Sequence, residues 1–288
     1  MKAARIAIIG LGLIGGSLGL ALKNALGSKV KITGVDRCSS SLAEAKQRGA
    51  VDIISADDHA LANQDIVFVC TPVLQIGLVM QQILPYLTAG TIITDVGSTK
   101  LFLLEQLRDI MPAGLSYIGG HPMAGREKSG ITAADKNLFV NKWYILSQGI
   151  HTNPEQYQVL SELLQATGAK VIAMNAAEHD CGAAYMSHIP HVVAAGLVNL
   201  LHNRSSQENL LRLMGGGFKD TTRIASSDAD MWSDICLTNS TAMINGLKEY
   251  QNILEEVVGA IERADRARLY TFFSSAKEKR DNMLEQEA

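Results

Sequence analysis

The chain has 288 residues, of which 47% are hydrophobic and 19% are charged. This composition predicts a globular protein with a sizeable core, and at roughly 100–200 residues per domain the length suggests two domains. The net charge of -3 provides no basic face, which argues against nucleic acid and anionic membrane surfaces as partners.

An uncharged apolar run from Ile6 to Leu22 follows Lys2 and Arg5 and superficially resembles a signal peptide or short anchor. Its glycines weaken a membrane helix, and it is shorter than the ~20 residues needed to span a bilayer. We identify no later candidate span. The 4 cysteines show neither metal-ligand nor redox spacing and fit a reducing compartment. We therefore expect a cytoplasmic protein without membrane contact.

The first half of the chain alternates short β-branched runs with helical stretches. Strands are predicted at Arg5–Ile9, Lys31–Val35, Ile66–Cys70 and Thr91–Asp95. Helices are predicted between them at Ile14–Ala25, Ser40–Gln47, Leu74–Leu84 and Lys100–Ile110. The alternation is typical of a parallel sheet with helices on both faces. Further strands that extend this sheet are predicted at Ser116–Ile118, Lys142–Ser147 and Lys170–Ala173.

Around Asn175 the hydrophobic pattern changes, and the rest of the chain is predicted to be almost entirely helical. Helices are predicted at Glu178–Leu201, Gln207–Leu213, Trp232–Arg263 and Asp265–Asn282. We therefore predict an α/β domain at 1–174 and an all-α domain at 175–288. An apolar stripe on the third of these helices recurs at steps of three and four: Met243, Leu247, Tyr250, Leu254, Val257, Val258 and Ile261. It must be buried, either in a core or in a subunit interface.

The segment Gly10-Leu11-Gly12-Leu13-Ile14-Gly15 fits the dinucleotide pattern G-x-G-x-x-G between a predicted strand and a predicted helix. In this pattern the first glycine permits the turn, the second lets backbone approach the pyrophosphate, and the third allows helix–strand packing. Alone, such a turn could serve packing only. Asp36 ends the second strand, where the adenosine ribose hydroxyls would lie, so we predict a dinucleotide site.

The charge of Asp36 would repel a 2′-phosphate and favours NAD over NADP. Arg37 could pair with such a phosphate, which leaves NADP use open. Thr71 and Pro72 follow the third strand and either reach the cofactor or simply form a turn. The predicted cofactor-binding residues are Gly10, Gly12, Leu13, Ile14, Gly15, Asp36, Arg37, Thr71 and Pro72.

Two segments follow strands at their carboxyl ends, where ligands bind in such sheets: DVGSTK at 95–100 and GGHPMAG at 119–125. His121 is predicted in a loop, where its imidazole can accept a proton from a substrate hydroxyl while hydride leaves the same carbon. Ser98 either bonds that hydroxyl or caps the helix that begins near Lys100.

Two further segments lie in the second half. SHIPH at 187–191 interrupts an otherwise apolar helix, and GGGFKDTTRIA at 215–225 reads as a flexible, charged stretch between helices. An arginine in the second segment could form a bidentate pair with a carboxylate. The alternative is a helix-capping loop with surface charges.

Together, GLGLIGGSLG, DVGSTK, GGHPMAGREKSG, SHIPH and GGGFKDTTRIASSDADMW, in this order and spacing, resemble the prephenate/arogenate dehydrogenase family of tyrosine biosynthesis. The resemblance extends from Arg5 to about Met283. It implies an NAD(P)-binding Rossmann-type domain with a parallel-rich sheet, an all-α dimerisation domain and an active site between them. The implied reaction is oxidative decarboxylation of a cyclohexadienol: hydride passes to nicotinamide, carbon dioxide leaves, and the ring becomes aromatic. Prephenate would give 4-hydroxyphenylpyruvate, and arogenate would give tyrosine.

The resemblance also implies residue roles. His121 would accept the hydrogen bond of the ring hydroxyl with assistance from Ser98, and Arg223 would bind a substrate carboxylate. The other residues implied at the substrate are His191, His188, Gly216, Lys219, Asp220, Glu127, Ser227 and Trp232. Ser227 and Trp232 are expected to enter the partner subunit's site of a homodimer. Arg126 stands where relatives often carry Thr or Ser, which puts the local substrate contacts in doubt.

Two alternatives stay open. A dehydrogenase of the 3-hydroxyisobutyrate type would need an acid–base lysine, for which Lys219 is the candidate, and would leave His121 unexplained. A non-catalytic NAD-sensing module would require His121 to be structural. We expect no metal site, no chorismate mutase segment and no appended regulatory domain.

Overall fold

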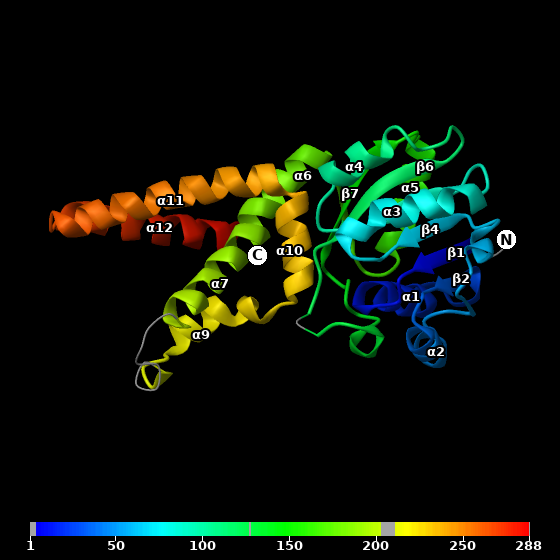
Figure 1. Ribbon diagram of the computed structural model, residues 1–288, viewed down its shortest axis with the longest axis horizontal. Coiled ribbons are helices and arrows are strands. Elements are labelled where there is room, and N and C mark those ends of the chain that lie inside the picture. The colour runs from blue at the N-terminus through cyan, green and yellow to red at the C-terminus, as the bar shows by residue number, and fades with distance from the viewer. Residues whose placement is uncertain (1–3, 127, 203–210, 288) are drawn as a thin grey trace. The chain divides into compact units, whose positions relative to one another are not determined.

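The computed structural model describes residues 4–126, 128–202 and 211–287 (Figure 1). By its internal contacts the chain forms two compact units, Met1–Ser240 and Thr241–Ala288. The predicted boundary between 174 and 175 stays a prediction.

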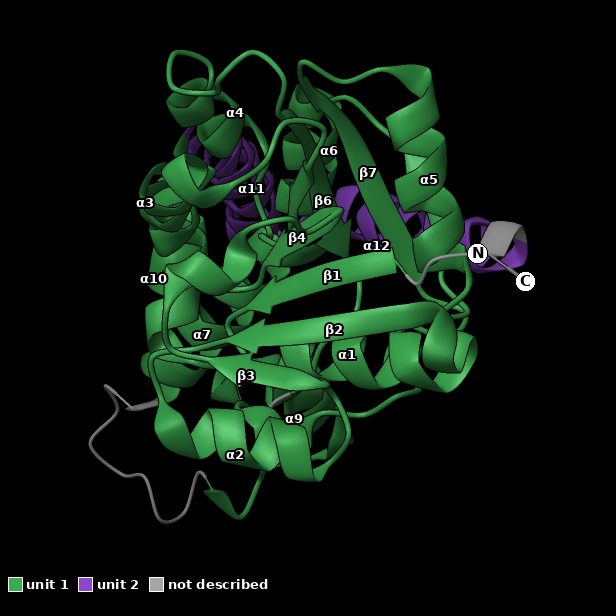
Figure 2. Cartoon of the chain, turned by 90° about the vertical axis from the view of Figure 1, so that its right-hand side faces the viewer, with its two compact units in different colours: residues 1–240 green, residues 241–288 purple. Residues whose placement is uncertain are grey.

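The larger unit is built on an 8-stranded sheet with the strand order β3-β2-β1-β4-β5-β6-β7-β8 (Figure 2). All neighbouring strands are parallel except β6 and β7, which pair antiparallel. The strands are β1 (Ala4–Ile9), β2 (Val30–Val35), β3 (Ile53–Ser55), β4 (Ile66–Val69), β5 (Ile92–Asp95), β6 (Ser116–Pro122), β7 (Trp143–Ile150) and β8 (Lys170–Ala173). Every predicted strand is present, and β3 was not predicted.

Helices cover both faces of the sheet because its central strands are apolar on both. In β1, Ile6 and Ile8 pack on one face, whereas Ala7 and Ile9 pack on the other. The helices with core residues on the first face are α1 (Leu13–Leu26), α2 (Ser39–Gln47) and α5 (Pro154–Gln165). Those on the second face are α3 (Val73–Ile83) and α4 (Leu101–Leu107).

Helix α5 was missed by the sequence analysis although it carries a start signal. Asn153 accepts a hydrogen bond from the backbone of Gln156, and the Gln156 side chain accepts one in return from the Asn153 backbone. This capping box precedes Leu160 and Leu164, which are fully buried.

The order of the strands positions the predicted cofactor site. β1 lies between β2 and β4, so the chain leaves β1 toward one side and later returns on the other side. At such a switch point ligands bind beyond the carboxyl ends of the strands. The glycine-rich turn after β1 and the turn after β4 lie there.

The helical part of the larger unit begins with one long helix. It runs as α6 (Ala176–Ala183), a π-helical turn (Ala184–His188) and α7 (Ile189–His202). Contrary to our expectation, this stretch is apolar and long enough to be a candidate membrane span, at Ala176–Leu201 with a mean hydropathy of 1.2. Asp180 and His188 on this stretch are buried and hydrogen-bonded, and 22% of its most apolar window is buried.

The segment predicted as a flexible stretch at 215–225 is ordered instead, and that expectation was wrong. It forms α9 (Gly216–Thr222) and a 3-10 turn (Arg223–Ser226). The Thr222 hydroxyl donates back to the Phe218 carbonyl oxygen one helical turn earlier, at 2.7 Å. The predicted helix at Gln207–Leu213 falls largely outside the described residues.

The long helix predicted at Trp232–Arg263 is two helices, α10 (Ala229–Thr238) and α11 (Ser240–Glu262). They separate at Asn239, which leaves helical geometry with φ -117° and ψ 30°. Its buried side-chain amide donates to the Asp180 carbonyl at 2.7 Å, a long-range contact that periodicity cannot predict. In the smaller unit α11 is followed by α12 (Arg266–Glu287).

Candidate active site

The glycines of the turn after β1 have distinct structural roles. Gly10 has φ +88°, and a Cβ atom there would lie 2.8 Å from the Cys70 carbonyl oxygen. A Cβ atom on Gly15 would lie 2.0 Å from the Gly10 carbonyl oxygen, so close packing of α1 on the turn needs a glycine. Around Gly12 the space is open, with nothing within 4 Å of a Cβ atom. The turn therefore combines a tightly packed base with an open backbone at the N-terminus of α1, which suits a pyrophosphate.

Asp36 lies beside this turn at the end of β2. Its carboxylate accepts hydrogen bonds from the backbone N–H groups of Leu11, at 2.7 Å, and Cys38, at 2.8 Å. Each carboxylate oxygen keeps a further lone pair for a ribose hydroxyl. Arg37 is exposed and donates to the Gln82 side chain at 3.4 Å.

The turn after β4 supplies an independent indication of a ligand. The Thr71 Oγ1 atom is buried and has no hydrogen-bond partner in the described part of the chain. Buried hydroxyls normally find a partner, and Thr71 follows β4 at the switch point. The open Gly12 backbone and this hydroxyl fit a dinucleotide.

His121 lies inside strand β6, where its pairing partner is Ile145 of β7, rather than in the predicted loop. The preceding glycines misled the sequence reasoning because they serve close packing. A Cβ atom on Gly119 would lie 2.3 Å from the Ser147 hydroxyl, and one on Gly120 would lie 2.4 Å from the Asp95 carbonyl oxygen. The strand therefore fixes the imidazole more rigidly than a loop would.

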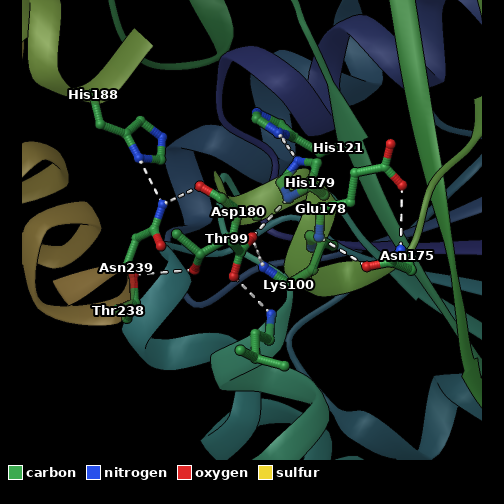
Figure 3. Close-up of polar contacts among 12 residues, drawn as sticks. Thr99, Lys100, His121, Asn175, Glu178, His179, Asp180, His188, Thr238 and Asn239 are labelled. Carbon is green, nitrogen blue, oxygen red and sulfur yellow. Dashed lines mark hydrogen bonds and ion pairs between the residues drawn. The ribbon is translucent and has the colours of Figure 1, made fainter. Parts of the chain in front are cut away.

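The imidazole of His121 is buried and leads into a hydrogen-bonded line of side chains (Figure 3). Its Nδ1 atom lies 2.8 Å from Nε2 of His179, and Nδ1 of His179 lies 2.7 Å from a carboxylate oxygen of Asp180. Burial holds the pKa of His121 well below its ordinary value of 6.5, and positive charge on His179 and Lys100 would lower it further. His121 is therefore neutral at pH 7 and able to accept a proton.

The turn that carries Ser98 is fixed by a buried ion pair between Lys100 and Asp95. Asp95 also accepts hydrogen bonds from the Tyr117 hydroxyl at 2.9 Å and the Gly120 backbone at 3.1 Å. These contacts tie the β5–α4 turn to the strand of His121. Burial lowers the pKa of Lys100, although the adjacent Asp95 acts in the opposite direction.

Ser98 is half-buried in this turn and does not cap α4. The cap position is Lys100, and the first free N–H groups of the helix, at Lys100 and Leu101, donate to the Asp180 carboxylate at 2.8 and 2.9 Å. Asp180, rather than Ser98, therefore caps this helix.

His188 ends the π-helical turn and is almost fully buried. Its Nδ1 atom lies 3.1 Å from the side-chain nitrogen of Asn239, whose amide also bonds to Asp180 (Figure 3). Burial lowers the pKa of His188 to about 4. π-Helical turns occur frequently at functional sites, and here the turn directs the His188 imidazole toward Asn239.

His191 lies one turn further along α7 and stacks on Trp232, with ring centroids 3.6 Å apart and planes at 24°. Its Nδ1 atom donates to the Ser187 carbonyl oxygen at 2.9 Å. Burial lowers the pKa of His191, and the positive charge of Arg223 contributes, so Arg223 lies near this ring. This contact of Trp232 lies within one chain, and its expected entry into the partner subunit's site stays a prediction.

The remaining predicted substrate residues lie at the periphery of this group. Gly216, Lys219 and Asp220 are exposed on the short helix α9, directly before Arg223. The Ser227 hydroxyl donates to the Ile224 carbonyl oxygen at 2.8 Å. Glu127 lies outside the described residues.

Sequence reasoning missed His179, Asp180 and Asn239, which connect the predicted residues. They are buried and bond to partners at least 51 positions away in the chain. The one available signal was a pair of adjacent polar residues, His179 and Asp180, in an apolar helical stretch. The larger unit thus offers a neutral proton acceptor, further imidazoles with a guanidinium near His191, and a turn suited to a dinucleotide.

Comparison with known proteins identifies the family of the chain. The family model "Prephenate dehydrogenase, nucleotide-binding domain" matches residues 18–173, and the model "Prephenate dehydrogenase, dimerization domain" matches residues 175–275. The prephenate dehydrogenase of Bacillus subtilis is 37% identical over 286 residues, covering 96% of this chain and 76% of that protein.

Solved structures agree along almost the whole chain. The prephenate dehydrogenase from A. aeolicus, in complex with hydroxyphenyl propionate and NAD+, superposes with a TM-score of 0.90 at 31% identity, covering 98% of this chain and 99% of that chain. The arogenate dehydrogenase of Synechocystis superposes with a TM-score of 0.84 at 30% identity, covering 97% and 99%. By these matches the chain belongs to the prephenate dehydrogenase family.

Proposed function

We propose that this chain catalyses the NAD-dependent oxidative decarboxylation of prephenate to 4-hydroxyphenylpyruvate, carbon dioxide and NADH. The observation that carries the proposal is the state of His121. This imidazole is buried, neutral at pH 7 and engaged at Nδ1 by His179. Its Nε2 atom is therefore the nitrogen left to accept a hydrogen bond from a substrate hydroxyl and then its proton.

The cofactor is NAD, which supplies the hydride acceptor when bound. The Gly10–Gly15 turn would hold the pyrophosphate at the N-terminus of α1. Asp36 would bind the adenosine ribose, and its charge disfavours a 2′-phosphate. Thr71, whose buried hydroxyl lacks a protein partner in the described chain, would contact the cofactor beyond β4.

The substrate would be held by its carboxylates on the other side of His121. Arg223 is exposed and lies near His191, so a carboxylate could pair with the guanidinium beside the His191–Trp232 stack. Ser98 would assist at the ring hydroxyl. Burial keeps His188 and His191 mainly neutral, so the fixed positive charge for the carboxylate comes from Arg223.

A paired assay tests the substrate and the cofactor together. Purified protein is incubated with prephenate or arogenate, each with NAD or NADP, and formation of the reduced cofactor is followed by absorbance. We expect turnover with prephenate and NAD. Turnover with arogenate alone would reassign the substrate, an alternative supported by the 30% identity to the Synechocystis arogenate dehydrogenase.

Replacement of His121 distinguishes an enzyme from a binding module. His121→Asn should lower kcat by roughly 100-fold or more, because it removes the proton acceptor, while the affinity for NAD is retained. An unchanged rate would remove His121 from the mechanism. NAD binding by the native chain without turnover of any cyclohexadienol would favour the NAD-sensing module. A 3-hydroxyisobutyrate-type reaction would have to use Lys219, which is exposed on α9.

We also infer that the chain is a cytoplasmic homodimer with domains at 1–174 and 175–288. The match to a dimerization domain model at residues 175–275 supports the oligomeric state and the boundary. Exposed apolar side chains on α11 supply a surface for it, among them Leu254 and Val258. The small-molecule substrate and NAD require no nucleic-acid or membrane partner.

A further inference from the structure

A continuous line of hydrogen bonds leads from the proposed proton acceptor to a carboxylate on another element. It runs from His121 on β6 through His179 to Asp180, both on α6, with contacts of 2.8 and 2.7 Å (Figure 3). At most 9% of any of these three residues is exposed. The proposed function uses only the His121 end of this line.

The chemistry of Asp180 fixes the direction of the line. Its carboxylate also accepts the backbone N–H groups of Lys100 and Leu101, at the N-terminus of α4. Those donors and the helix dipole stabilise the negative charge, and an ionised carboxylate can only accept hydrogen bonds. The Nδ1 atom of His179 must therefore carry the hydrogen of the His179–Asp180 contact.

The consequence passes along the line to His121. A neutral imidazole carries one ring hydrogen, so with that hydrogen on Nδ1 the Nε2 atom of His179 has a free lone pair. Its Nε2 atom then accepts, and the Nδ1 atom of His121 donates. A neutral His121 with hydrogen on Nδ1 has an unprotonated Nε2 atom, the state that a proton acceptor needs.

We propose that His179 and Asp180 are positioning residues that hold His121 in the tautomer with Nδ1 protonated and Nε2 free. When Nε2 takes the proton of the substrate hydroxyl, the charge on the His121 ring is stabilised through His179 by the Asp180 carboxylate. The same carboxylate anchors the start of α4, directly after Ser98, and so positions both proposed catalytic residues. This role rests on the proposed function.

The tautomer can be measured without turnover. The full-length protein, with ¹⁵N-labelled histidine, is examined by NMR at neutral pH, and the His121 signals are identified as those lost in His121→Asn. We expect Nδ1 of His121 to be protonated and Nε2 to be unprotonated. Hydrogen on Nε2 in the native protein would overturn the proposal. Because this readout needs no substrate, it decides the tautomer even if no cyclohexadienol is turned over.

Asp180→Asn removes the negative charge at the end of the line, and its amide nitrogen must face a backbone N–H group of Lys100 or Leu101 in either orientation. The state of His121 with hydrogen on Nδ1 should then lose population, and kcat should fall by about 100-fold or more while the affinity for NAD is retained. An unchanged tautomer and an unchanged kcat would contradict the role of Asp180.

A second pair of variants separates positioning from folding. In His179→Gln the side-chain oxygen can still accept from Nδ1 of His121, so the tautomer and most of kcat should be retained. His179→Leu removes the acceptor, and kcat should fall at least tenfold below that of His179→Gln. Equal kcat values in the two variants would contradict the proposal.

A matched control tests for indirect effects of a weakened α6. The Asn175 side chain caps this helix by accepting from the Glu178 backbone at 2.8 Å, and it does not contact His121. Asn175→Ala should lower the stability of the helix and leave the His121 tautomer unchanged. A change of tautomer in this variant would show that helix stability, rather than the hydrogen-bonded line, sets the state of His121.

Discussion

At the scale of single residues, different side chains of the candidate site accept the proton and bind the negatively charged substrate. Burial is the largest cause of the lowered pKa values of His121, His188 and His191. A neutral imidazole can accept a proton, whereas a buried imidazolium near the reacting hydroxyl could not. Arg223 stays positively charged at any relevant pH. Because Arg223 lies beside His191, the site has a positive charge even though its histidines are neutral.

Arg223 should therefore act mainly in substrate binding. Arg223→Ala is expected to raise KM for prephenate by about 10- to 100-fold, the range for a lost hydrogen bond to a charged group, with a smaller effect on kcat. The salt bridge would exist in the ground and transition states alike, which confines its loss to KM. Steady-state kinetics of this variant and of the charge-conserving Arg223→Lys measure the effect. A defect confined to kcat would contradict the carboxylate-binding role.

The buried histidines also predict how stability changes with pH. His188 has an ordinary pKa of 6.5 in the unfolded chain and about 4 in the folded one. Between these values only the unfolded chain binds the proton. The free energy of unfolding should therefore fall as the pH drops from 6.5 to 4, by up to about 3 kcal/mol from this residue.

Urea unfolding at pH 7, 5.5 and 4.5 measures this slope, with pH points chosen to sample the window of the two pKa values. His188→Gln should flatten it, whereas the same substitution at the exposed His59 should not. A slope that is equally steep in His188→Gln would assign the effect to other groups.

At the scale of secondary structure elements, the hydrophobic pattern predicted those helices and strands whose positions depend on the local sequence. The strands of the parallel sheet were found because they are short, β-branched apolar runs, and the helices between them because their buried faces recur with a period of 3.6 residues. Tertiary contacts decided the rest. Strand β6 continues past Ile118 because Gly119 and Gly120 pack against neighbouring segments, and α10 separates from α11 where the Asn239 side chain bonds to Asp180.

The same division applies to the candidate site. Residues with a sequence pattern could be predicted, such as Gly10 in its spaced turn or His121 beside its glycines. His179 and Asp180 have no such pattern, because their partners lie in β6 and α4, far along the chain. Their roles follow from hydrogen bonds that only the folded chain brings together.

The turn between β1 and α1 allows two glycine roles to be tested against each other. Gly15→Ala would place a methyl group 2.0 Å from the Gly10 carbonyl oxygen, so we expect a loss of about 1–3 kcal/mol in stability. Gly12→Ala meets open space and should change stability by less than about 0.5 kcal/mol. It should still weaken NAD binding, because its methyl group lies where the pyrophosphate approaches.

Thermal unfolding and NAD titration of both variants measure the two effects separately. The comparison is sharp because each glycine is the control for the other. If Gly12→Ala bound NAD as tightly as the native chain, the open space at this residue would not be the pyrophosphate site.

At the scale of the whole molecule, the apolar stripe of α11 is only partly covered within one chain. Met243, near the start of the helix, is 3% exposed, whereas Leu254 is 47% and Val258 is 53% exposed. Burial of such side chains stabilises an assembly by roughly 25 cal/mol for each Å² removed from water. The exposed end of the stripe therefore favours an interface over a core as the explanation of its periodicity.

Sedimentation of the purified chain tests this interface, with Leu254→Asp/Val258→Asp as the disruptive variant. The native chain should sediment as a dimer, and the variant should dissociate, because association would bury two carboxylates without partners. Asn252 lies on the side of α11 opposite the stripe. The control variant Asn252→Asp adds one charge without altering the stripe, so this variant should remain dimeric. A native chain that is a stable, active monomer would contradict the interface. A dimer that survives both aspartates would place its contacts on other surfaces.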